Sequence, residues 1–102
     1  MKVVWTRQAR SRLAEIRDFI ARDNPAAADR HLQRLIERAQ VVTQFPALGR
    51  EIPELPGTAL RELIEGNYRI VYRVRQETVE ILTVFEAHHL LPLEDLSPPP
   101  KT

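Results

Sequence analysis

Hydrophobic residues recur every three or four positions in the first half of the chain, which is the spacing of an amphipathic helix. In the first such stretch they fall at Ala9, Leu13, Ile16 and Ile20. Thr6 is well placed to cap this helix, and a β-branched and aromatic run at 2–5 indicates a short strand before it. The pattern therefore predicts a strand followed by a helix that runs to about Asp23.

A second amphipathic stretch follows almost at once. Asn24 and Pro25 end the first helix and start the second, because Asn caps well and Pro is tolerated at the first helical position. The same spacing of apolar residues then continues until shortly before Pro46. With so short a connection, the two helices are expected to pack as an antiparallel hairpin.

Beyond residue 58 the hydrophobic period changes to two, which is typical of strands. The intervening segment 45–58 is rich in proline and glycine and is expected to be a loop. Three strands are predicted at 59–65, 68–75 and 78–86, with two-residue turns between them. The order of elements predicts an α+β fold in which the helical hairpin packs on one face of a mainly antiparallel four-stranded sheet (βααβββ).

The predicted registers sort the strand residues onto two faces. We expect the helices to cover Leu63, Tyr68, Ile70, Tyr72, Val74, Val79, Ile81 and Phe85. The other face collects Leu60, Glu62, Ile64, Arg69, Val71, Arg73, Glu80, Leu82, Val84, Glu86 and His88. Apart from the proline loop or the tail, no element is left to cover this second face, so we expect it to be open to a partner or substrate.

Length and composition limit the possible domain organisation and localisation of the protein. The 102 residues suit one domain, predicted at 1–95, with a Pro-rich tail at 96–102 that is expected to be disordered. The chain lacks cysteine, a membrane-length apolar stretch and a signal peptide, which favours a cytoplasmic protein without disulfides or thiolate metal sites.

Charge is distributed unevenly along the chain. Residues 1–50 carry ten Lys and Arg against five Asp and Glu, whereas residues 51–102 carry five against nine. This asymmetry indicates a basic helical surface that meets an acidic partner or nucleic acid, or simply Arg-rich helix faces in contact with water.

The residues that could bind a ligand or take part in catalysis lie on the face expected to be open. Arg69 is predicted opposite Val84 with no acid directly facing it, whereas Arg73 lies opposite Glu80 and is explained by a cross-strand ion pair. His88 is either a general acid or base or an ordinary residue at a strand end. Because adjacent strand residues point to opposite faces, His88 and His89 are not expected to share a metal, and no cofactor is expected.

An ordered set of segments resembles the RelE/ParE toxin superfamily. The set comprises VVWTRQARSRLAEIRDFIARDNPAAADRHLQRL near the N-terminus, FPALGREI in the loop, RELIEGNYRIVYRV in the strand pair and VEILTVFEAHHLL at the end. The resemblance extends to about residue 95. It implies two helices on an antiparallel sheet and a cognate antitoxin whose C-terminal segment wraps the toxin in a heteromeric complex.

Two activities exist within that superfamily. Ribosome-dependent mRNA endonucleases of the RelE or YoeB type are one, and the resemblance would assign the catalytic roles to Arg69, His88 and either Glu54 or Glu51. ParE-like members instead inhibit DNA gyrase. His89 stands where the nuclease pattern has Tyr, and the aromatic side chain needed to stack a base is missing.

We therefore favour a ParE-like toxin that binds gyrase and has no chemistry of its own. The residues predicted to contact the antitoxin or the target are Arg61, Arg69, Arg73, Leu82, Val84, Glu86, His88 and His89. The alternatives are the endonuclease and an inactive module that binds the antitoxin alone.

Overall fold

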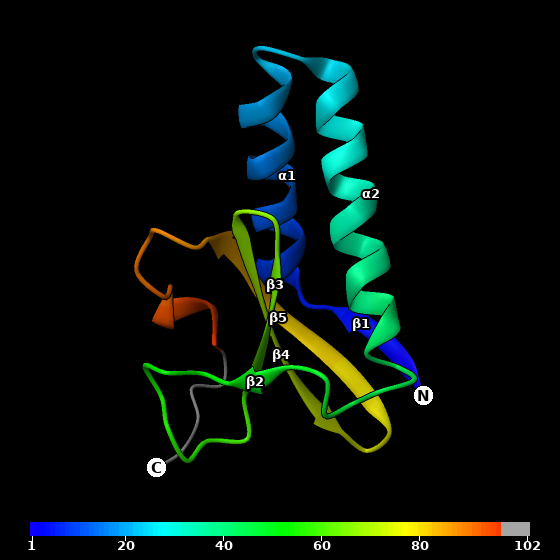
Figure 1. Ribbon diagram of the computed structural model, residues 1–102, viewed down its shortest axis with the longest axis vertical. Coiled ribbons are helices and arrows are strands. Elements are labelled where there is room, and N and C mark those ends of the chain that lie inside the picture. Colours follow the sequence, from blue (N-terminus) through cyan, green and yellow to red (C-terminus); the bar gives the residue numbers. More distant parts are fainter. Residues whose placement is uncertain (97–102) are drawn as a thin grey trace.

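The computed structural model describes residues 1–96 and confirms the predicted α+β fold (Figure 1). Its elements are β1 (Lys2–Trp5), α1 (Arg7–Ala21), α2 (Pro25–Val41), β2 (Arg50–Glu51), β3 (Arg61–Glu65), β4 (Tyr68–Arg75), β5 (Thr78–Glu86) and the 3₁₀ helix η1 (Leu93–Asp95). The sheet has five strands in the order β1-β5-β4-β3-β2, with β1 parallel to β5 and the other pairs antiparallel. The fifth strand is β2, a two-residue piece of the predicted loop that pairs with β3.

Both helices begin at the predicted caps. The Thr6 hydroxyl accepts a hydrogen bond from the Ala9 amide at 3.2 Å, and the Asn24 side chain accepts one from the Ala27 amide at 3.1 Å. Each bond satisfies an amide that the first helical turn leaves unpaired. The helices lie side by side and extend beyond the sheet at the end where they are connected (Figure 1). No helix in the described part of the chain is long and apolar enough to cross a membrane.

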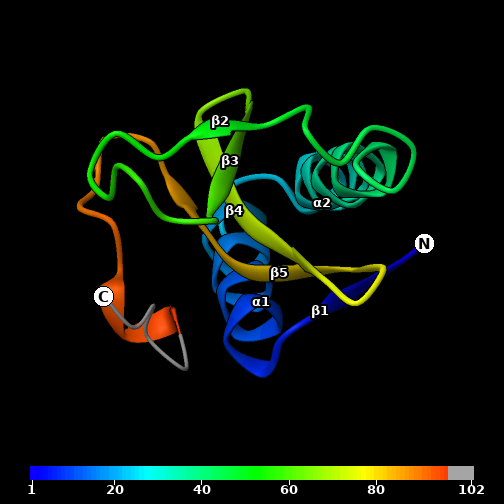
Figure 2. The ribbon, with the colours of Figure 1, turned by 90° about the horizontal axis from the view of Figure 1, so that it is seen from below.

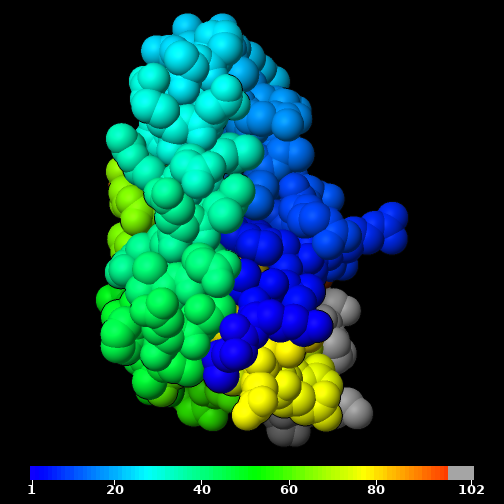
Figure 3. All heavy atoms as spheres, turned by 90° about the vertical axis from the view of Figure 1, so that its right-hand side faces the viewer, coloured from blue at the N-terminus to red at the C-terminus, as the bar shows by residue number. Residues whose placement is uncertain are grey.

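The first core lies between the helical hairpin and the sheet. Its buried members are Ala9, Leu35, Ala39, Val42, Leu63, Ile70, Tyr72, Val79, Ile81 and Val84. Seen from that side, the two helices hide most of the sheet and leave the turn between β4 and β5 visible (Figure 3). The Tyr72 hydroxyl donates to the Pro46 carbonyl and accepts from the Gly49 amide, both at 2.8 Å, which fixes the chain after α2 against the core.

A β-bulge in β5 changes the predicted faces near its end. Val71 pairs with Thr83, but Tyr72 pairs with Ile81, so Leu82 is an extra residue without a partner on β4. The Thr6 hydroxyl lies 3.3 Å from the Leu82 carbonyl and donates to it. Beyond the bulge every side chain changes face relative to the prediction.

Four assignments are wrong for this reason. Arg69 pairs with Phe85 and not with Val84. Val84 lies in the core beneath the helices, whereas Phe85 belongs to the opposite face. Glu86 pairs with Tyr68, a residue that packs against the helical core.

The second face of the sheet is covered, and the prediction of an open face is wrong. A second core forms there from Ile52, Leu60, Val71, Leu82, Phe85, Leu91 and Leu96, with Leu55 packed against it. The chain supplies its own cover: the loop between β2 and β3 and the C-terminal segment lie on the left of Figure 2, with α2 on the right. Leu96 is 1% exposed, so it belongs to the domain and not to the predicted tail. The rest of that tail, 97–102, lies outside the described residues.

Candidate functional site

Arg69 lies at the centre of a charged cluster on the second face. Its Nε donates to Glu62 Oε1 at 2.6 Å, and its two Nη atoms donate to the Glu54 carboxylate at 2.8 and 2.7 Å. The other oxygen of Glu62 accepts from Arg50 Nε at 2.7 Å. The Arg69 guanidinium carbon also lies 4.9 Å from the centroid of the Phe85 ring. Both planar edges and one face of the guanidinium are therefore occupied.

The Arg69–Glu62 pair is buried, whereas the Glu54 side chain is 40% exposed. The Arg69 side chain is 9% exposed and that of Glu62 is 0% exposed, so neither charge has water as an alternative partner. The hydrogen bonds that Arg69 donates to Glu54 and then to Glu62 raise the pKa of Arg69 although burial opposes this, and the bonds donated to Glu54 lower the pKa of that carboxyl. Arg69 and Glu54 therefore both stay ionised at neutral pH. Arg69 cannot hold a phosphate without giving up one of these carboxylates.

Two more of the predicted contact residues are also engaged. Arg61 donates from Nη1 to the Gly49 carbonyl at 2.7 Å. Arg73 donates from Nε to Glu80 at 2.6 Å, which confirms the cross-strand ion pair expected from the register. Arg61 therefore joins β3 to the loop before β2, and Arg73 joins β4 to β5.

The remaining predicted contacts separate by exposure. The side chains of Leu82 and Val84 are buried on opposite faces of the sheet, so neither is exposed to a partner in this structure. Glu86 is half-buried, and His88 and His89 are exposed. Neither imidazole forms a hydrogen bond or ion pair with another described residue, whereas Arg69 and Glu54 bind each other. No group of three potential metal ligands occurs among residues 1–96.

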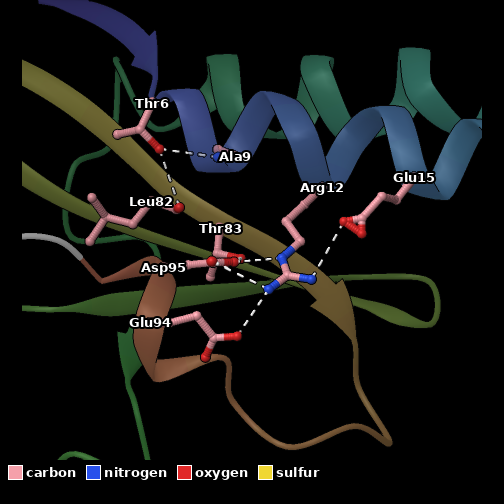
Figure 4. Close-up of polar contacts among 8 residues, drawn as sticks. All are labelled: Thr6, Ala9, Arg12, Glu15, Leu82, Thr83, Glu94 and Asp95. Carbon is pink, nitrogen blue, oxygen red and sulfur yellow. Dashed lines mark hydrogen bonds and ion pairs between the residues drawn. The ribbon is translucent and has the colours of Figure 1, made fainter.

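A second polar cluster fastens the C-terminal segment to α1. Arg12 donates from Nε to Asp95 Oδ2 at 2.6 Å and from Nη2 to Glu94 at 3.3 Å, and its Nη1 lies 3.5 Å from Glu15 (Figure 4). Asp95 also accepts from the buried hydroxyl of Thr83 at 2.8 Å. The hydrogen bond with Asp95 is the main cause of a raised pKa of Arg12. This cluster holds the segment that closes the second core.

Sequence reasoning missed the Arg12 cluster. The residues that form the central pair, Arg12 and Asp95, are 83 positions apart, and no spacing rule connects them. The one signal was the acidic pair at 94–95, next to the apolar residues Leu91, Leu93 and Leu96 in a segment whose composition otherwise indicates a loop.

A groove of about 390 Å³ opens where α1 passes over the end of β5. It is lined by Arg12, Glu15, Ile16, Phe19, Tyr68, Val84, Phe85, Glu86 and His89. Phe19 is 65% exposed although it is a large apolar residue. It lies outside the helical stripe, since it precedes Ile20, and that misplaced aromatic residue was the signal for the groove in the sequence.

Comparison with known proteins gives consistent results. The family profile described as "ParE toxin of type II toxin-antitoxin system, parDE" matches residues 3–90. "Putative toxin Y4kP" of Sinorhizobium fredii is 38% identical over 95 residues, covering 89% of this chain and 93% of that protein. "Toxin RelE2" of Caulobacter vibrioides is 37% identical over 90 residues, covering 87% of this chain and 98% of that protein.

A solved structure has the same fold. A chain of the "Chromosomal ParDE TA system from P. aeruginosa" matches with a TM-score of 0.71 and 27% identity, covering 84% of this chain and 95% of that one. The paired helices and the sheet therefore represent an arrangement already seen in a solved toxin–antitoxin system.

Proposed function

Because this chain belongs to the ParE family of toxins from type II toxin–antitoxin systems, we propose that it arrests growth by binding its target, DNA gyrase, and catalyses no reaction itself. A cognate antitoxin neutralises it in a heteromeric complex in the cytoplasm. The proposal makes the protein's surface, and not a catalytic group, responsible for toxicity.

The observation that carries the proposal is the state of Arg69. A nuclease of the kind considered from the sequence needs a free guanidinium to stabilise charge on a phosphate, and a carboxylate that is free to take part in proton transfer. Here Arg69 and Glu54 neutralise each other through two hydrogen bonds, and Glu62 occupies the third donor position. Arg69 and Glu54 are thus committed to holding the loop after β2 on the sheet, and the alternative carboxylate, Glu51, accepts a hydrogen bond from the Gly57 amide.

An mRNA endonuclease is the second candidate, and one observation favours it. His88 and His89 are exposed beyond the end of β5, where an imidazole is free to exchange protons with a bound substrate. In this alternative the Arg69–Glu54 pair must open when RNA binds.

Inducible expression without a partner separates the candidates. Plasmid supercoiling and the incorporation of labelled amino acids are measured in the same culture after induction. The proposal predicts relaxed or cleaved plasmid DNA while translation continues, and the same result for His88→Ala. Blocked translation with unchanged supercoiling, abolished by His88→Ala, would favour the endonuclease. Normal growth with both signals unchanged would indicate an inactive module.

A further inference from the structure

The connected ends of the helices project past the sheet, and the groove lies beside these projecting turns. In Figure 1 the last turns of α1 extend beyond the ends of the strands, so no strand covers them. Ile16 and Phe19 come from this part of α1, and Tyr68 lies across from them at the start of β4. Apolar residues of α1, one on its stripe and one beside it, thus extend past the point where the sheet can bury them.

The groove has an apolar floor and an acidic rim. Ile16, Phe19 and Tyr68 contribute accessible apolar surface, whereas Glu15 and Glu86 bring carboxylates to the edge. Figure 4 shows the Glu15 side chain extending from α1 on the side of β5.

The Glu86 carboxylate is the charge left unpaired at this rim. Arg12 also lines the groove, but its Nε, Nη2 and Nη1 are shared among Asp95, Glu94 and Glu15. Glu86 forms no ion pair with any residue of the described range 1–96. The free charge at the rim is therefore negative.

These features identify the kind of partner. Negative charge at the rim repels the phosphates of a nucleic acid. A surface Phe beside an apolar groove is typical of a protein-binding site, in which a bulky apolar side chain fills the groove and a charged neighbour pairs with the rim. Charge complementarity requires that neighbour to be a lysine or an arginine.

We propose that this groove, the Phe19 groove, is where the cognate antitoxin anchors: one bulky apolar side chain of the antitoxin packs between Phe19 and Tyr68, and an adjacent Lys or Arg pairs with Glu86. The inference rests on the proposed pairing with an antitoxin, and it adds a location and a sequence requirement. The antitoxin's neutralising segment must carry an apolar residue with a basic residue next to it or one helical turn away.

Affinity measurements on purified protein test this inference. The probe is the small protein encoded in the reading frame adjacent to that of this chain, purified and titrated by isothermal calorimetry. Phe19→Asp removes the apolar wall and places an unpaired charge there, and we expect it to weaken binding at least about 30-fold, as for a central interface residue. Glu86→Arg is expected to weaken binding about tenfold, since it sets like charges against each other.

Two matched controls lie away from the groove. Phe45→Asp changes a residue that is 59% exposed, almost as much as Phe19, but follows α2 at the opposite end of the hairpin. Glu77→Arg reverses a charge in the turn before β5, whereas Glu86 ends that strand. Both controls should bind within about twofold of wild type. Far-UV circular dichroism and thermal melting establish that each variant is folded.

The outcomes are distinct. Reversing the antitoxin's basic residue to Glu should restore the affinity of Glu86→Arg, which a merely unfolded variant would not show. Wild-type affinity of folded Phe19→Asp would overturn the groove assignment while leaving the antitoxin pairing intact. If Phe19→Asp instead changes the oligomeric state of the free chain without changing affinity, a second copy occupies the groove and the assignment is wrong. Absence of binding by the wild type would overturn the proposed function as well.

Discussion

Replacing Arg69 by Met removes the positive charge at the centre of the second core and leaves Glu62 buried. The Glu62 side chain is 0% exposed, and its remaining cationic partner is Arg50, whose side chain is 62% exposed. Breaking a buried pair by removing one partner costs about 3–5 kcal/mol, because the other charge loses its compensation without regaining water. A domain of this size has roughly 5–15 kcal/mol of stability in total. The expected loss is a large part of it.

The assay is urea unfolding followed by the fluorescence of Trp5, the single tryptophan, together with thermal melting. A cost of about 3–5 kcal/mol corresponds to a fall in Tm of roughly 12–40 °C for a domain of about 100 residues. The matched control is Arg73→Met, which breaks the more exposed pair with Glu80 and should cost about 1 kcal/mol or less.

A double variant separates the buried charge from lost packing. If Glu62 is the cause, adding Glu62→Gln to Arg69→Met should recover at least about 1 kcal/mol, because no carboxylate is then left without a partner in the interior. The reasoning is refuted if Arg69→Met costs no more than Arg73→Met, or if the double variant is less stable than Arg69→Met alone.

Three further perturbations follow from the same structure. Gly49→Ala should destabilise the fold by about 1–3 kcal/mol in urea unfolding, since a Cβ there would lie 2.6 Å from Tyr72 Cε1 and 2.8 Å from a backbone carbonyl oxygen; an unchanged midpoint would contradict this. The pKa of Glu54 is lowered by Arg69, so its contribution is present above the unfolded pKa of about 4.3 and is lost as pH falls through the lower folded value. Glu54→Gln should therefore flatten the stability profile below about pH 4, and an unaltered profile would count against the pairing. Asp95→Ala should loosen the C-terminal segment and speed its cleavage in limited proteolysis with a nonspecific protease, whereas equal cleavage rates would show that the Arg12 cluster does not fasten it.

Local signals in the sequence were enough to predict the helices and the order of the strands. The caps at Thr6 and Asn24 and the two-residue turns act within a few residues of the positions they control, and the structure confirms both. The register of β4 and β5 is also as predicted from the turn to Arg73 and Glu80. These features depend on neighbours in the chain, which a sequence displays directly.

The bulge at Leu82 shows where that reasoning fails. One extra residue reverses the faces of all residues after it, and nothing in the run TVEILTVFE marks the position. The position is stabilised from outside the strand pair, since the Thr6 hydroxyl satisfies the Leu82 carbonyl from 76 residues away. For this reason Val84, Phe85 and Glu86 were assigned to the wrong sides.

Sequence reasoning names the proline loop and the tail as the elements that could cover the second face, but no sequence signal indicates that they pack there, for a related reason. Its apolar residues, such as Ile52, Leu55 and Leu91, are single positions among prolines and charges, and they form no periodic pattern. They become a core when two loops meet on the sheet, and Arg69 then finds Glu54 in one of those loops. An arginine that looked free in the sequence is thereby paired.

The central claim is that this chain acts by binding and not by catalysis. It is tested in one reaction that contains the purified protein, gyrase and relaxed plasmid. The account predicts that the protein blocks ATP-dependent supercoiling and raises the amount of cleaved plasmid, that His88→Ala does both equally well, and that mRNA on programmed ribosomes stays intact. Unimpaired supercoiling, with ribosome-dependent mRNA cuts that disappear in His88→Ala, would contradict it.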